Sequence, residues 1–277
     1  MVIAKISDGF GNQLFMYACG YAVAKRLKTS LLLDISYLDN SSLRKYELDK
    51  LNIERKSIFT TRKLKCYPLR VTYRKIYHTW LRIRGFHFLK EKRTYIYNSG
   101  FTQLKDKTYL YGYWQTEKYF KDCRSDILKM FTPNYPLSVG CREYLKTVEQ
   151  CNSVAIHVRR GDYVNLGICL DQSYYHQALL KMKEMVKTPQ YFIFSDDMEF
   201  AKQLFEGENV DVSFVQYDSE NSTLEDLFIM KSCKYIIMAN SSYSWWAAWL
   251  NDNPFKIVIH PNDHQKDDFY PSEWLTI

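Results

Sequence analysis

Several features that define other classes of protein are missing from this chain of 277 residues. No apolar run approaches the roughly 20 residues that cross a bilayer, so we expect no transmembrane helix. The start of the chain has no basic leader, apolar core or small-residue cleavage site, which predicts a cytoplasmic protein. Internal repeats and low-complexity tracts are also absent.

Patterns that bind metal ions are scarce as well. The seven cysteines are scattered, with no C-x-x-C pair, and are predicted to be reduced residues that mostly serve packing. His260 and His264 have an H-x-x-x-H spacing, but Pro261 prevents the helix that would bring both rings to one face. The pair Asp-x-Asp does not occur. We therefore predict no metal site and no cofactor.

The composition is that of a soluble globular protein, with 46% hydrophobic and 25% charged residues. The length allows two α/β domains, each with a core of its own. The net charge of +7 is local, because residues 62–93 hold eleven Lys or Arg against the single acid Glu91. This segment therefore carries +10, and the rest of the chain sums to −3.

The basic segment predicts an amphipathic helix near residues 69–84 that ends at Gly85. Cations opposite an apolar face suit a membrane surface that carries anionic lipid. Two other readings stay open: the solvated face of a helix packed on the core, and RNA binding, although no recognition module accompanies the arginines and tyrosines. The apolar residues recur at i, i+3, i+4, i+7 and i+8: Tyr73, Ile76, Tyr77, Trp80 and Leu81.

The first 34 residues predict a βαβ unit with its helix at 12–28. Gly9 and Gly11 would let the backbone come close to a ligand at the start of this helix, where free N–H groups favour an anion. A dinucleotide site is disfavoured, because Leu14 stands where that fingerprint needs a small residue.

From residue 153 onward, strands and helices alternate at the spacing of βαβ crossovers, which predicts a parallel sheet with helices on both faces. Ligands bind such sheets at the carboxyl ends of the strands. Three polar turns follow predicted strands and should meet there: Arg159–Asp162, Ser195–Asp197 and Asn240–Ser242. Two adjacent guanidiniums, on Arg159 and Arg160, match a diphosphate better than a lone carboxylate. The strands are expected at 153–158, 191–194, 212–215, 235–238 and 256–260, and the helices near 173–186, 198–205, 223–232 and 243–251.

Four blocks of the sequence carry a family resemblance. Residues 157–163 read H-x-R-R-x-D-Y, and residues 7–18 are similar to G-G-x-G-N-Q-x-F-x-Y-A, with Asp8 in place of the first glycine. Residues 193–197, Ile-Phe-Ser-Asp-Asp, and 240–250, which contain Asn-Ser-Ser-Tyr-Ser-Trp-Trp, supply the other two. Together, and over most of the chain, they resemble the α1,2-fucosyltransferases, glycosyltransferase family 11, of bacterial type.

The resemblance implies a GT-B-like α/β fold with two Rossmann-like domains that face a cleft and a donor site in the C-terminal parallel sheet. Residues 1–150 would form an acceptor-side domain that carries the basic helical insert at about 62–93. Residues 151–277 would bind the nucleotide sugar. The implied reaction is inverting transfer of L-fucose from GDP-fucose to the 2-hydroxyl of a galactose residue on a glycan. A GDP-sugar transferase of the same fold with a different acceptor hydroxyl is the alternative.

The resemblance also implies partners and a location. GDP-fucose is a co-substrate, not a cofactor. The acceptor is a galactose-terminated oligosaccharide or a lipid-linked glycan on the way to a surface polysaccharide, and no nucleic acid takes part. The enzyme would be cytoplasmic, and the basic segment adds peripheral contact with the inner face of an anionic cytoplasmic membrane to what we expect.

Individual roles follow from the same resemblance. It assigns Arg159 to the leaving diphosphate as a catalytic residue and makes Arg160 an orienting partner. It implies that His157 and Asp196 contact guanine, while a buried strand histidine satisfied by the backbone is the other reading of His157. The serines of the last block stand at a helix start, where they would bind phosphate or cap the helix. The residues expected to bind GDP-fucose are Gly9, Gly11, Asn12, Gln13, His157, Arg159, Arg160, Ser195, Asp196, Asp197, Asn240, Ser241, Ser242 and Ser244.

Two candidates stay open for the base that activates the acceptor hydroxyl. Asp162 lies in the first motif, but a carboxylate so close to two arginines is held ionised and makes a poorer base. Asp171 lies later in the same loop. The sequence does not decide between them.

We predict that transfer survives full chelation of divalent metal ions. Glycosyltransferases of the other main architecture hold a metal at the diphosphate with an Asp-x-Asp pair, whereas this chain offers Arg159 and Arg160. The measurement is product formation in excess EDTA, before and after Mg²⁺ or Mn²⁺ is added back. Loss of turnover that either ion restores would contradict the prediction. A modest gain from added metal would not, because a metal can speed product release.

Overall fold

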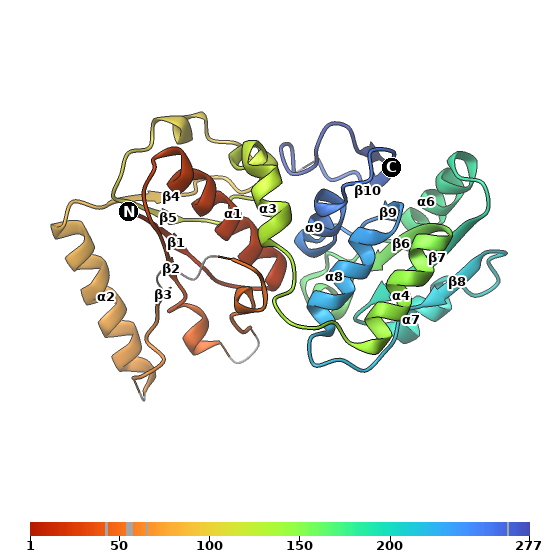
Figure 1. The fold of residues 1–277 in the computed structure, drawn as a ribbon, viewed down its shortest axis with the longest axis horizontal. Coiled ribbons are helices and arrows are strands. Elements are labelled where there is room, and N and C mark those ends of the chain that lie inside the picture. Colours follow the sequence, from red (N-terminus) through yellow and green to blue (C-terminus); the bar gives the residue numbers. More distant parts are fainter. Residues whose placement is uncertain (42–43, 54–57, 65, 265) are drawn as a thin grey trace. The chain divides into compact units, whose positions relative to one another are not determined.

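The computed structural model describes residues 1–277 apart from 42–43, 54–57, 65 and 265. These residues form two compact units, each built around a parallel sheet of its own (Figure 1). The predicted α/β fold with two parallel sheets is confirmed. Unit 1 is Met1–Asn134 with Gln265–Phe269, and unit 2 is Tyr135–His264 with Tyr270–Ile277.

The described part of unit 1 holds a five-stranded sheet in the order β3-β2-β1-β5-β4, and each neighbouring pair is parallel. Helix α1 (Phe10–Arg26) joins β1 to β2, as the predicted βαβ unit requires. It begins at Phe10 because Gly9, in an extended conformation, is its N-cap. A short helix, α3 (Arg124–Met130), lies near the end of the unit. The strands are β1 (Val2–Lys5), β2 (Leu31–Asp34), β3 (Ile58–Phe59), β4 (His87–Lys90) and β5 (Thr108–Tyr111).

Helix α2 (Tyr67–Ile83) is the basic amphipathic helix that the sequence predicts. Pro68 stands in its first turn, where the missing N–H costs nothing. Gly85 follows its end with a φ of 81°, a left-handed conformation that favours glycine and stops the helix. Lys65, one of the eleven cations of the basic segment, lies outside the described residues.

The apolar residues predicted to share one face of α2 differ in how deeply they are buried. Leu81 is fully buried against β1 and β5, and Tyr77 stacks on the phenylalanine of β3 with ring centroids 3.7 Å apart. Tyr73, Ile76 and Trp80 point to solvent, with exposed fractions of 50%, 60% and 49%. The five positions form one wide apolar arc, and the sheet covers only the part that holds Tyr77 and Leu81.

The described part of unit 2 holds a six-stranded sheet in the order β11-β10-β9-β6-β7-β8, again parallel. The predicted strands and helices from residue 153 onward are confirmed to within two residues at each end, whereas α4, α5 and β11 were not predicted. The strands are β6 (Asn152–Val158), β7 (Pro189–Ser195), β8 (Asp211–Phe214), β9 (Tyr235–Ile237), β10 (Val258–His260) and β11 (Leu275–Thr276). The helices are α4 (Val139–Gln150), α5 (Gly161–Leu166), α6 (Gln172–Met185), α7 (Met198–Leu204), α8 (Ser222–Ser232) and α9 (Ser242–Leu250).

Helices cover both faces of this sheet, as predicted. Helices α6 and α7 pack on Val154, Ile156 and Val158 of β6 in one buried apolar cluster. Side chains alternate along a strand, so His157 faces the opposite side, where its ring centroid lies 5.4 Å from that of Tyr243 in α9. Helix α4 packs on α8 and β6 and therefore belongs to unit 2, whereas the sequence placed the domain boundary after residue 150.

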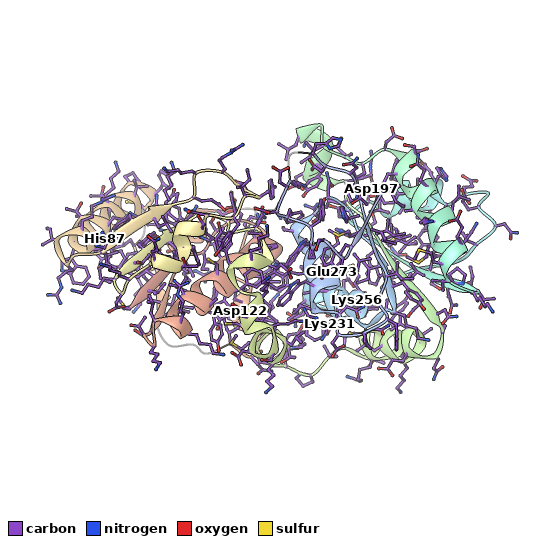
Figure 2. The ribbon with its side chains drawn as sticks, turned by 90° about the horizontal axis from the view of Figure 1, so that it is seen from above. His87, Asp122, Asp197, Lys231, Lys256 and Glu273 are labelled. Carbon is purple, nitrogen blue, oxygen red and sulfur yellow. The ribbon has the colours of Figure 1, made fainter. Side chains whose placement is uncertain are left out.

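Helix α9 is rich in tryptophan. The rings of Trp245, Trp246 and Trp249 are at most 2% exposed, and their centroids lie 5.1 to 6.0 Å apart. Lys256, labelled in Figure 2, donates to the carbonyl oxygens of Ala248 and Asn251 at 2.8 Å, so a cation meets the negative end of the helix dipole. Neither α9 nor any other helix of the described residues is both long and apolar enough to span a bilayer.

Leu81→Ala should lower the free energy of unfolding by about 2–5 kcal/mol, because it removes a fully buried side chain and leaves a cavity between α2 and its sheet. The matched control is Ile83→Ala on the same helix. Ile83 is 79% exposed, so its truncation should change that free energy by less than about 0.5 kcal/mol. Chemical denaturation followed by circular dichroism measures both. Equal losses would show that Leu81 does not anchor α2.

Candidate functional site

The three polar turns of unit 2 meet at one edge of its sheet. Strands β9, β6 and β7 are neighbours and run parallel, so the chain leaves all three on the same side. Val158, the last residue of β6, pairs in register with Ser195, the last residue of β7. The residues that follow, Arg159 and Asp196, therefore begin side by side, and Asn240 follows the end of β9.

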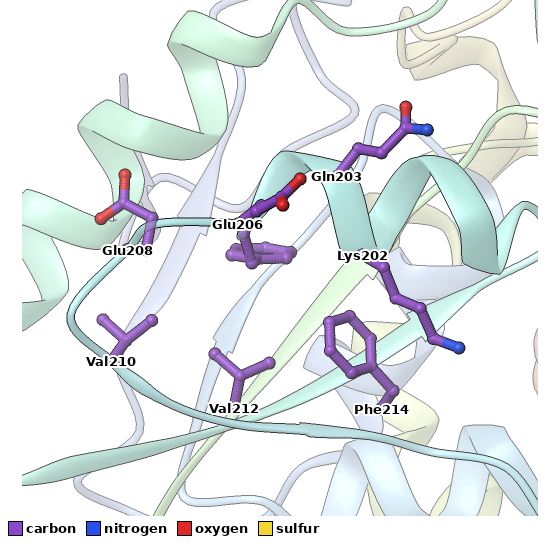
Figure 3. Close-up of a pocket in the computed structure, with 8 residues that line it drawn as sticks. Lys202, Gln203, Glu206, Glu208, Val210, Val212 and Phe214 are labelled. Atoms are coloured by element: carbon purple, nitrogen blue, oxygen red, sulfur yellow. The ribbon is translucent and has the colours of Figure 1, made fainter.

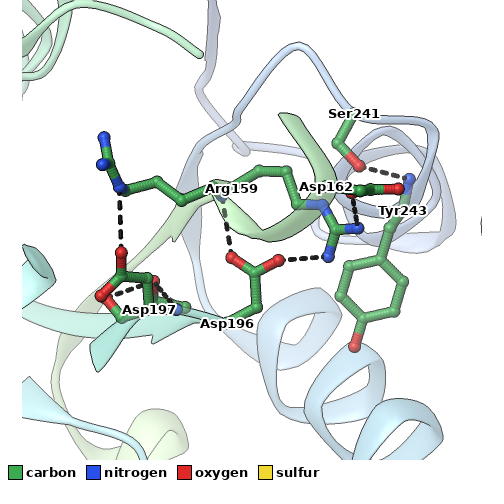
Figure 4. A network of polar contacts seen from close by, with 8 residues as sticks. Arg159, Asp162, Asp196, Asp197, Ser241 and Tyr243 are labelled. Atoms are coloured by element: carbon green, nitrogen blue, oxygen red, sulfur yellow. Dashed lines mark hydrogen bonds and ion pairs between the residues drawn. The ribbon is translucent and has the colours of Figure 1, made fainter. Parts of the chain in front are cut away.

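Arg159 lies between two carboxylates (Figure 4). One terminal nitrogen of its guanidinium contacts Asp162, and the other contacts Asp196 at 2.5 Å. Its Cζ atom also lies 5.3 Å from the ring centre of Tyr163. The side chain stays 23% exposed. A planar, permanently charged donor is thus held in one orientation while part of it remains open to a ligand, which suits an anion.

Arg160 is engaged in a different way. Its Nε donates to Oδ2 of Asp197 at 3.0 Å, and its Cζ lies 3.8 Å from the ring centre of Phe200. Asp197 also accepts from the N–H of Phe200 at 3.1 Å and so caps α7. The hydroxyl of Ser195 completes this turn, because it bonds both to the N–H and to the carbonyl oxygen of Asp197 at 3.0 Å. Arg160 is therefore held at the start of α7, and its role as an orienting partner of Arg159 stays a prediction.

Gly161 is required by the close approach of the chain to Asp196. A Cβ at this position would lie 2.4 Å from Oδ2 of Asp196, closer than real Cβ contacts come. That oxygen pairs with Arg159, and Oδ1 of the same carboxylate accepts from the backbone N–H of Arg160 at 2.8 Å. Any side chain at 161 would therefore push the carboxylate away from both of its partners.

His157 is buried as a neutral imidazole beside the cluster that Arg159 forms with Asp162 and Asp196. It is 5% exposed, and burial, followed by the charge on Arg159, lowers the pKa of His157 to about 3. Its Nδ1 is buried without a hydrogen-bond partner among the described residues, although such atoms are nearly always paired. The reading of a strand histidine satisfied by the backbone does not hold for this nitrogen. A neutral imidazole has one donor and one acceptor nitrogen, so the ring can recognise a polar edge.

The block after β9 supplies one helix cap, one tether and two further serines. Ser241 is the N-cap of α9 and accepts from the N–H of Tyr243 at 3.2 Å. Ser244 is fully buried, and its hydroxyl bonds to backbone carbonyls 3.3 Å away. Asn240 donates to a carbonyl oxygen in the loop after α5 at 2.9 Å, and Ser242 is a half-buried first residue of α9. The capping use is therefore visible for Ser241, and contact of any of these serines with phosphate stays a prediction.

The two candidate bases lie in different settings. Asp162 contacts Arg159 and is 44% exposed, which links it to the cluster. Asp171 is instead the N-cap of α6, where its carboxylate accepts from the N–H of Ser173 at 2.9 Å. This backbone N–H, followed by the hydroxyl of Ser173, lowers the pKa of Asp171. A carboxylate of lowered pKa is a weaker proton acceptor.

The opening block lies in unit 1, around the start of α1. Asp8 has a φ of 65°, in the left-handed region, which explains why the pattern it resembles has glycine there. The Asp8 carboxylate accepts from the hydroxyls of Ser7 at 2.6 Å and Tyr113 at 3.1 Å. Burial, followed by the charge on Asp8, raises the pKa of Tyr113 to about 12. One hydrogen bond from the neighbouring Ser7 and one from the distant Tyr113 thus hold Asp8 in a backbone conformation that few non-glycine residues adopt.

The other predicted residues of this block are mainly structural. Gly9 is the N-cap of α1 and Gly11 is buried in its first turn. The carbonyl oxygen of the Asn12 side chain accepts from the amide of Gln115 at 2.7 Å. Gln13 is fully buried and spans two segments, because its amide donates to the carbonyls of residues 8 and 45 and accepts from the N–H of residue 47. Contact of any of them with a donor sugar stays a prediction.

Three aromatic residues of the site were missed by sequence reasoning: Tyr163, Phe200 and Tyr243. They lie against Arg159, Arg160 and His157 respectively. Tyr163 and Tyr243 stand inside two of the four blocks, so the signal was present but was assigned to neighbouring residues. Phe200 stands one helical turn after Asp197, and only the phase of α7 places it under a guanidinium.

A hollow of about 440 Å³ lies elsewhere in unit 2, between α7 and β8 (Figure 3). Val210, Val212 and Phe214 line it together with Lys202 and Glu206. It contains none of the predicted site residues. In the part of the chain that the structure describes, no three or more His, Cys, Asp or Glu side chains gather as metal ligands do. Independence from metal stays a prediction for the chelation experiment.

The chain is similar to known proteins in sequence and in fold. A sequence model of the family described as "Glycosyl transferase family 11" matches residues 1–277. "Alpha-1,2-colitosyltransferase" of Escherichia coli is 30% identical, over 100% of this chain and 99% of its own. "O-antigen biosynthesis glycosyltransferase WbnK" of Escherichia coli is 33% identical, over 98% of this chain and 99% of its own. Among solved structures, NodZ alpha-1,6-fucosyltransferase soaked with GDP-fucose shares the fold, with a TM-score of 0.52 and 15% identity over 90% of this chain and 91% of that one.

The free energy of unfolding should fall by about 2 kcal/mol more in the parent than in a His157→Gln variant between about pH 7 and about pH 5. In the folded protein the pKa of His157 is about 3, below the usual value near 6.5 of the unfolded chain. The unfolded state therefore takes up the proton first, so stability is lost as the pH falls through this window. Denaturation curves at both pH values measure the difference. Parallel pH dependence in the two proteins would show that the folded state already binds this proton.

Proposed function

Because the chain belongs to glycosyl transferase family 11, we propose that this glycosyltransferase moves L-fucose from GDP-fucose to the 2-hydroxyl of a galactose residue on a glycan. The single observation that carries the proposal is the Arg159 guanidinium, oriented by Asp162 and Asp196 beside the neutral imidazole of His157. The resemblance of the four sequence blocks supports the donor and the linkage. The acceptor would be a galactose-terminated oligosaccharide or a lipid-linked precursor of a surface polysaccharide.

The proposed reaction inverts the anomeric carbon. The acceptor oxygen forms a bond to this carbon while the bond from the carbon to the β-phosphate oxygen breaks, and GDP leaves with the electron pair. Negative charge therefore grows on the diphosphate as the reaction proceeds. A guanidinium already in place, that of Arg159, stabilises this charge and lowers the barrier more than it tightens binding of the intact donor. Arginine supplies the positive charge itself, so we propose that no metal ion or other cofactor is needed.

Recognition of guanine is proposed to use Asp196 and His157. Two carboxylate oxygens can accept together from N1–H and the exocyclic amine of the base. Each oxygen of Asp196 already accepts once from this chain, and each retains a further lone pair. The Nδ1 of His157 has no partner among the described residues and would gain one from the nucleotide.

The hydroxyl proton of the acceptor must pass to a base. We propose Asp162 for this step ahead of Asp171, because Asp162 belongs to the Arg159 cluster whereas the carboxylate of Asp171 caps α6.

A second donor is favoured by one specific observation. The full-length relative at 30% identity is named an alpha-1,2-colitosyltransferase. Colitose is fucose without its 3-hydroxyl, so a pocket for one sugar differs little from a pocket for the other. The second candidate is therefore transfer of colitose from the corresponding GDP-sugar. Transfer to a different acceptor hydroxyl remains the other alternative within the same fold.

The test is to incubate the purified protein with GDP-fucose or GDP-colitose and a lactose-type acceptor, then to determine the linkage of the product. A fucosyl group on the 2-hydroxyl of galactose is the expected result. A preference for GDP-colitose would replace the donor in the proposal, and a product at another hydroxyl would replace the linkage. Hydrolysis of both donors with no transfer to any galactoside would overturn the proposed acceptor.

Arg159→Lys should lower kcat by about tenfold or more, because it keeps the charge but removes the planar fork, and a charge-assisted contact is worth roughly 1.5–3 kcal/mol. The matched control is Arg160→Lys, whose side chain packs on Phe200 and Asp197 and should leave kcat within about threefold. Steady-state kinetics with varied donor measures both. A normal kcat with only a raised donor KM in Arg159→Lys would show that the contact acts equally before and during bond cleavage.

A further inference from the structure

Helix α2 presents a row of large apolar side chains to solvent. The row recurs at i, i+4, i+7, i+11 and i+14, which keeps all five residues on one side of the helix. Their exposed fractions lie between 49% and 79%. At about 1.5 Å of rise per residue, the row covers most of a helix roughly 25 Å long. We call it the α2 row, and its residues are Leu69, Tyr73, Ile76, Trp80 and Ile83.

The other side of α2 is anchored, so the α2 row stays outward. Leu81 is fully buried on the sheet, and Tyr77 stacks on the phenylalanine of β3. The ring of His78 packs edge-on to Tyr109, with centroids 5.1 Å apart. These contacts hold α2 at the outside of unit 1, where Figure 1 shows it. Scattered apolar residues on a surface need no explanation, but an ordered row on a fixed helix does.

The cations of α2 and its end differ in how far they contact the rest of unit 1 and how far they are exposed to solvent. Arg70 donates to the carbonyl of Leu64 at 2.8 Å, and Arg74 lies 4.2 Å from the ring centre of Tyr37. Lys75, Arg82 and Arg84 are more exposed, at one border of the α2 row or just past the end of the helix, although Arg82 also lies 4.4 Å from the ring centre of Phe88 in β4. Arg84 lies 5.6 Å from the ring centre of Trp80, within the row itself. The helix contains no Asp or Glu.

This combination selects among partners. A second copy of the chain paired through the same row would set cations against cations, with no carboxylate on either helix to balance them. A nucleic acid would meet the cations but would leave the leucine and isoleucines of the row without an apolar partner. An anionic lipid surface offers both acyl chains and negative headgroups, and tryptophan and tyrosine favour the boundary between them.

We propose that α2 lies flat on an anionic membrane surface, with the α2 row among the headgroups and acyl chains and with Lys75, Arg82 and Arg84 on the phosphates. The proposal is independent of the donor and acceptor given above, because it concerns where the enzyme works. It also revises which cations matter, since Arg74 belongs to the packing of unit 1.

The protein carries its own reporter for this proposal. Trp80 is 49% exposed, whereas the other five tryptophans are at most 6% exposed. Vesicles of phosphatidylcholine mixed with phosphatidylglycerol should shift the emission of Trp80 to the blue, and brominated lipids should quench it. Vesicles of phosphatidylcholine alone should do so much less. Trp80→Phe should remove the signal while sedimentation with the vesicles persists.

Two variants separate charge from apolar burial. Lys75→Gln, Arg82→Gln and Arg84→Gln together should weaken partition onto the anionic vesicles by about a hundredfold at low salt, and the difference should shrink as salt is added. Leu69→Gln, Ile76→Gln and Ile83→Gln together should weaken it by about tenfold or more at any salt. Both should leave transfer to a small soluble acceptor unchanged. Matched controls change exposed residues of other surfaces to Gln: Lys121, Lys146 and Lys187 for charge, and Val139, Leu180 and Phe255 for apolar area.

Four outcomes would overturn the proposal. The first is a parent protein that stays off anionic vesicles, and the second is a loss of partition in the matched controls as large as that in the α2 variants. The third is a dimer in sedimentation that the apolar variant dissociates, which would make a second copy the occupant. The fourth is binding of single-stranded RNA with affinity lost in the charge variant and kept in the apolar one, which would make RNA the occupant.

Discussion

A guanidinium held between two carboxylates is the interaction on which the candidate site depends. The in-register pairing of β6 with β7 puts Arg159 next to Asp196, and a slip of one strand by one residue would turn its side chain away from the other. The absence of a side chain at Gly161 lets the chain close on that carboxylate. The positions of Arg160 and His157 follow from the same strand, so one ladder of backbone hydrogen bonds sets the arrangement of the cluster. The chemistry proposed for the protein therefore depends on the order of its sheet more than on any loop.

The sequence predicted the framework of this site for a physical reason. Strands buried on both faces read as short apolar runs, and the polar turn after each run marks the carboxyl edge of a parallel sheet. Which side chains touch within that edge did not follow, because contact depends on the phase of short helices. Phe200 under Arg160 is one such case. Helix α5 is another, because its six residues contain no buried position to give a period.

Long-range packing accounts for the remaining differences. The domain boundary was placed after residue 150 because the strand pattern resumes there, but α4 packs on α8 and β6 and so joins unit 2. On α2, periodicity identified an amphipathic helix and could not tell which part of its apolar arc meets a sheet. Asp8 departs from the glycine of the pattern it resembles, and the structure shows that the left-handed turn is kept by hydrogen bonds from Ser7 and Tyr113. The sequence pattern shows that the turn needs a residue that tolerates a left-handed φ. Which non-glycine residue can stand there depends on hydrogen bonds to partners such as Tyr113, which is far away in the sequence.

The packed tryptophans of α9 have a consequence for how the protein can be observed. Indole rings whose centroids lie 5.1 to 6.0 Å apart couple their electronic transitions, so this one helix should add an exciton signal to the circular dichroism of the protein. The cluster lies entirely in unit 2, beside the strands that carry the Arg159 site. Its exciton signal therefore reports the order of the proposed donor-binding half alone. Loss of that signal ahead of the far-ultraviolet signal would resolve the melting of unit 2 from that of unit 1 without any label.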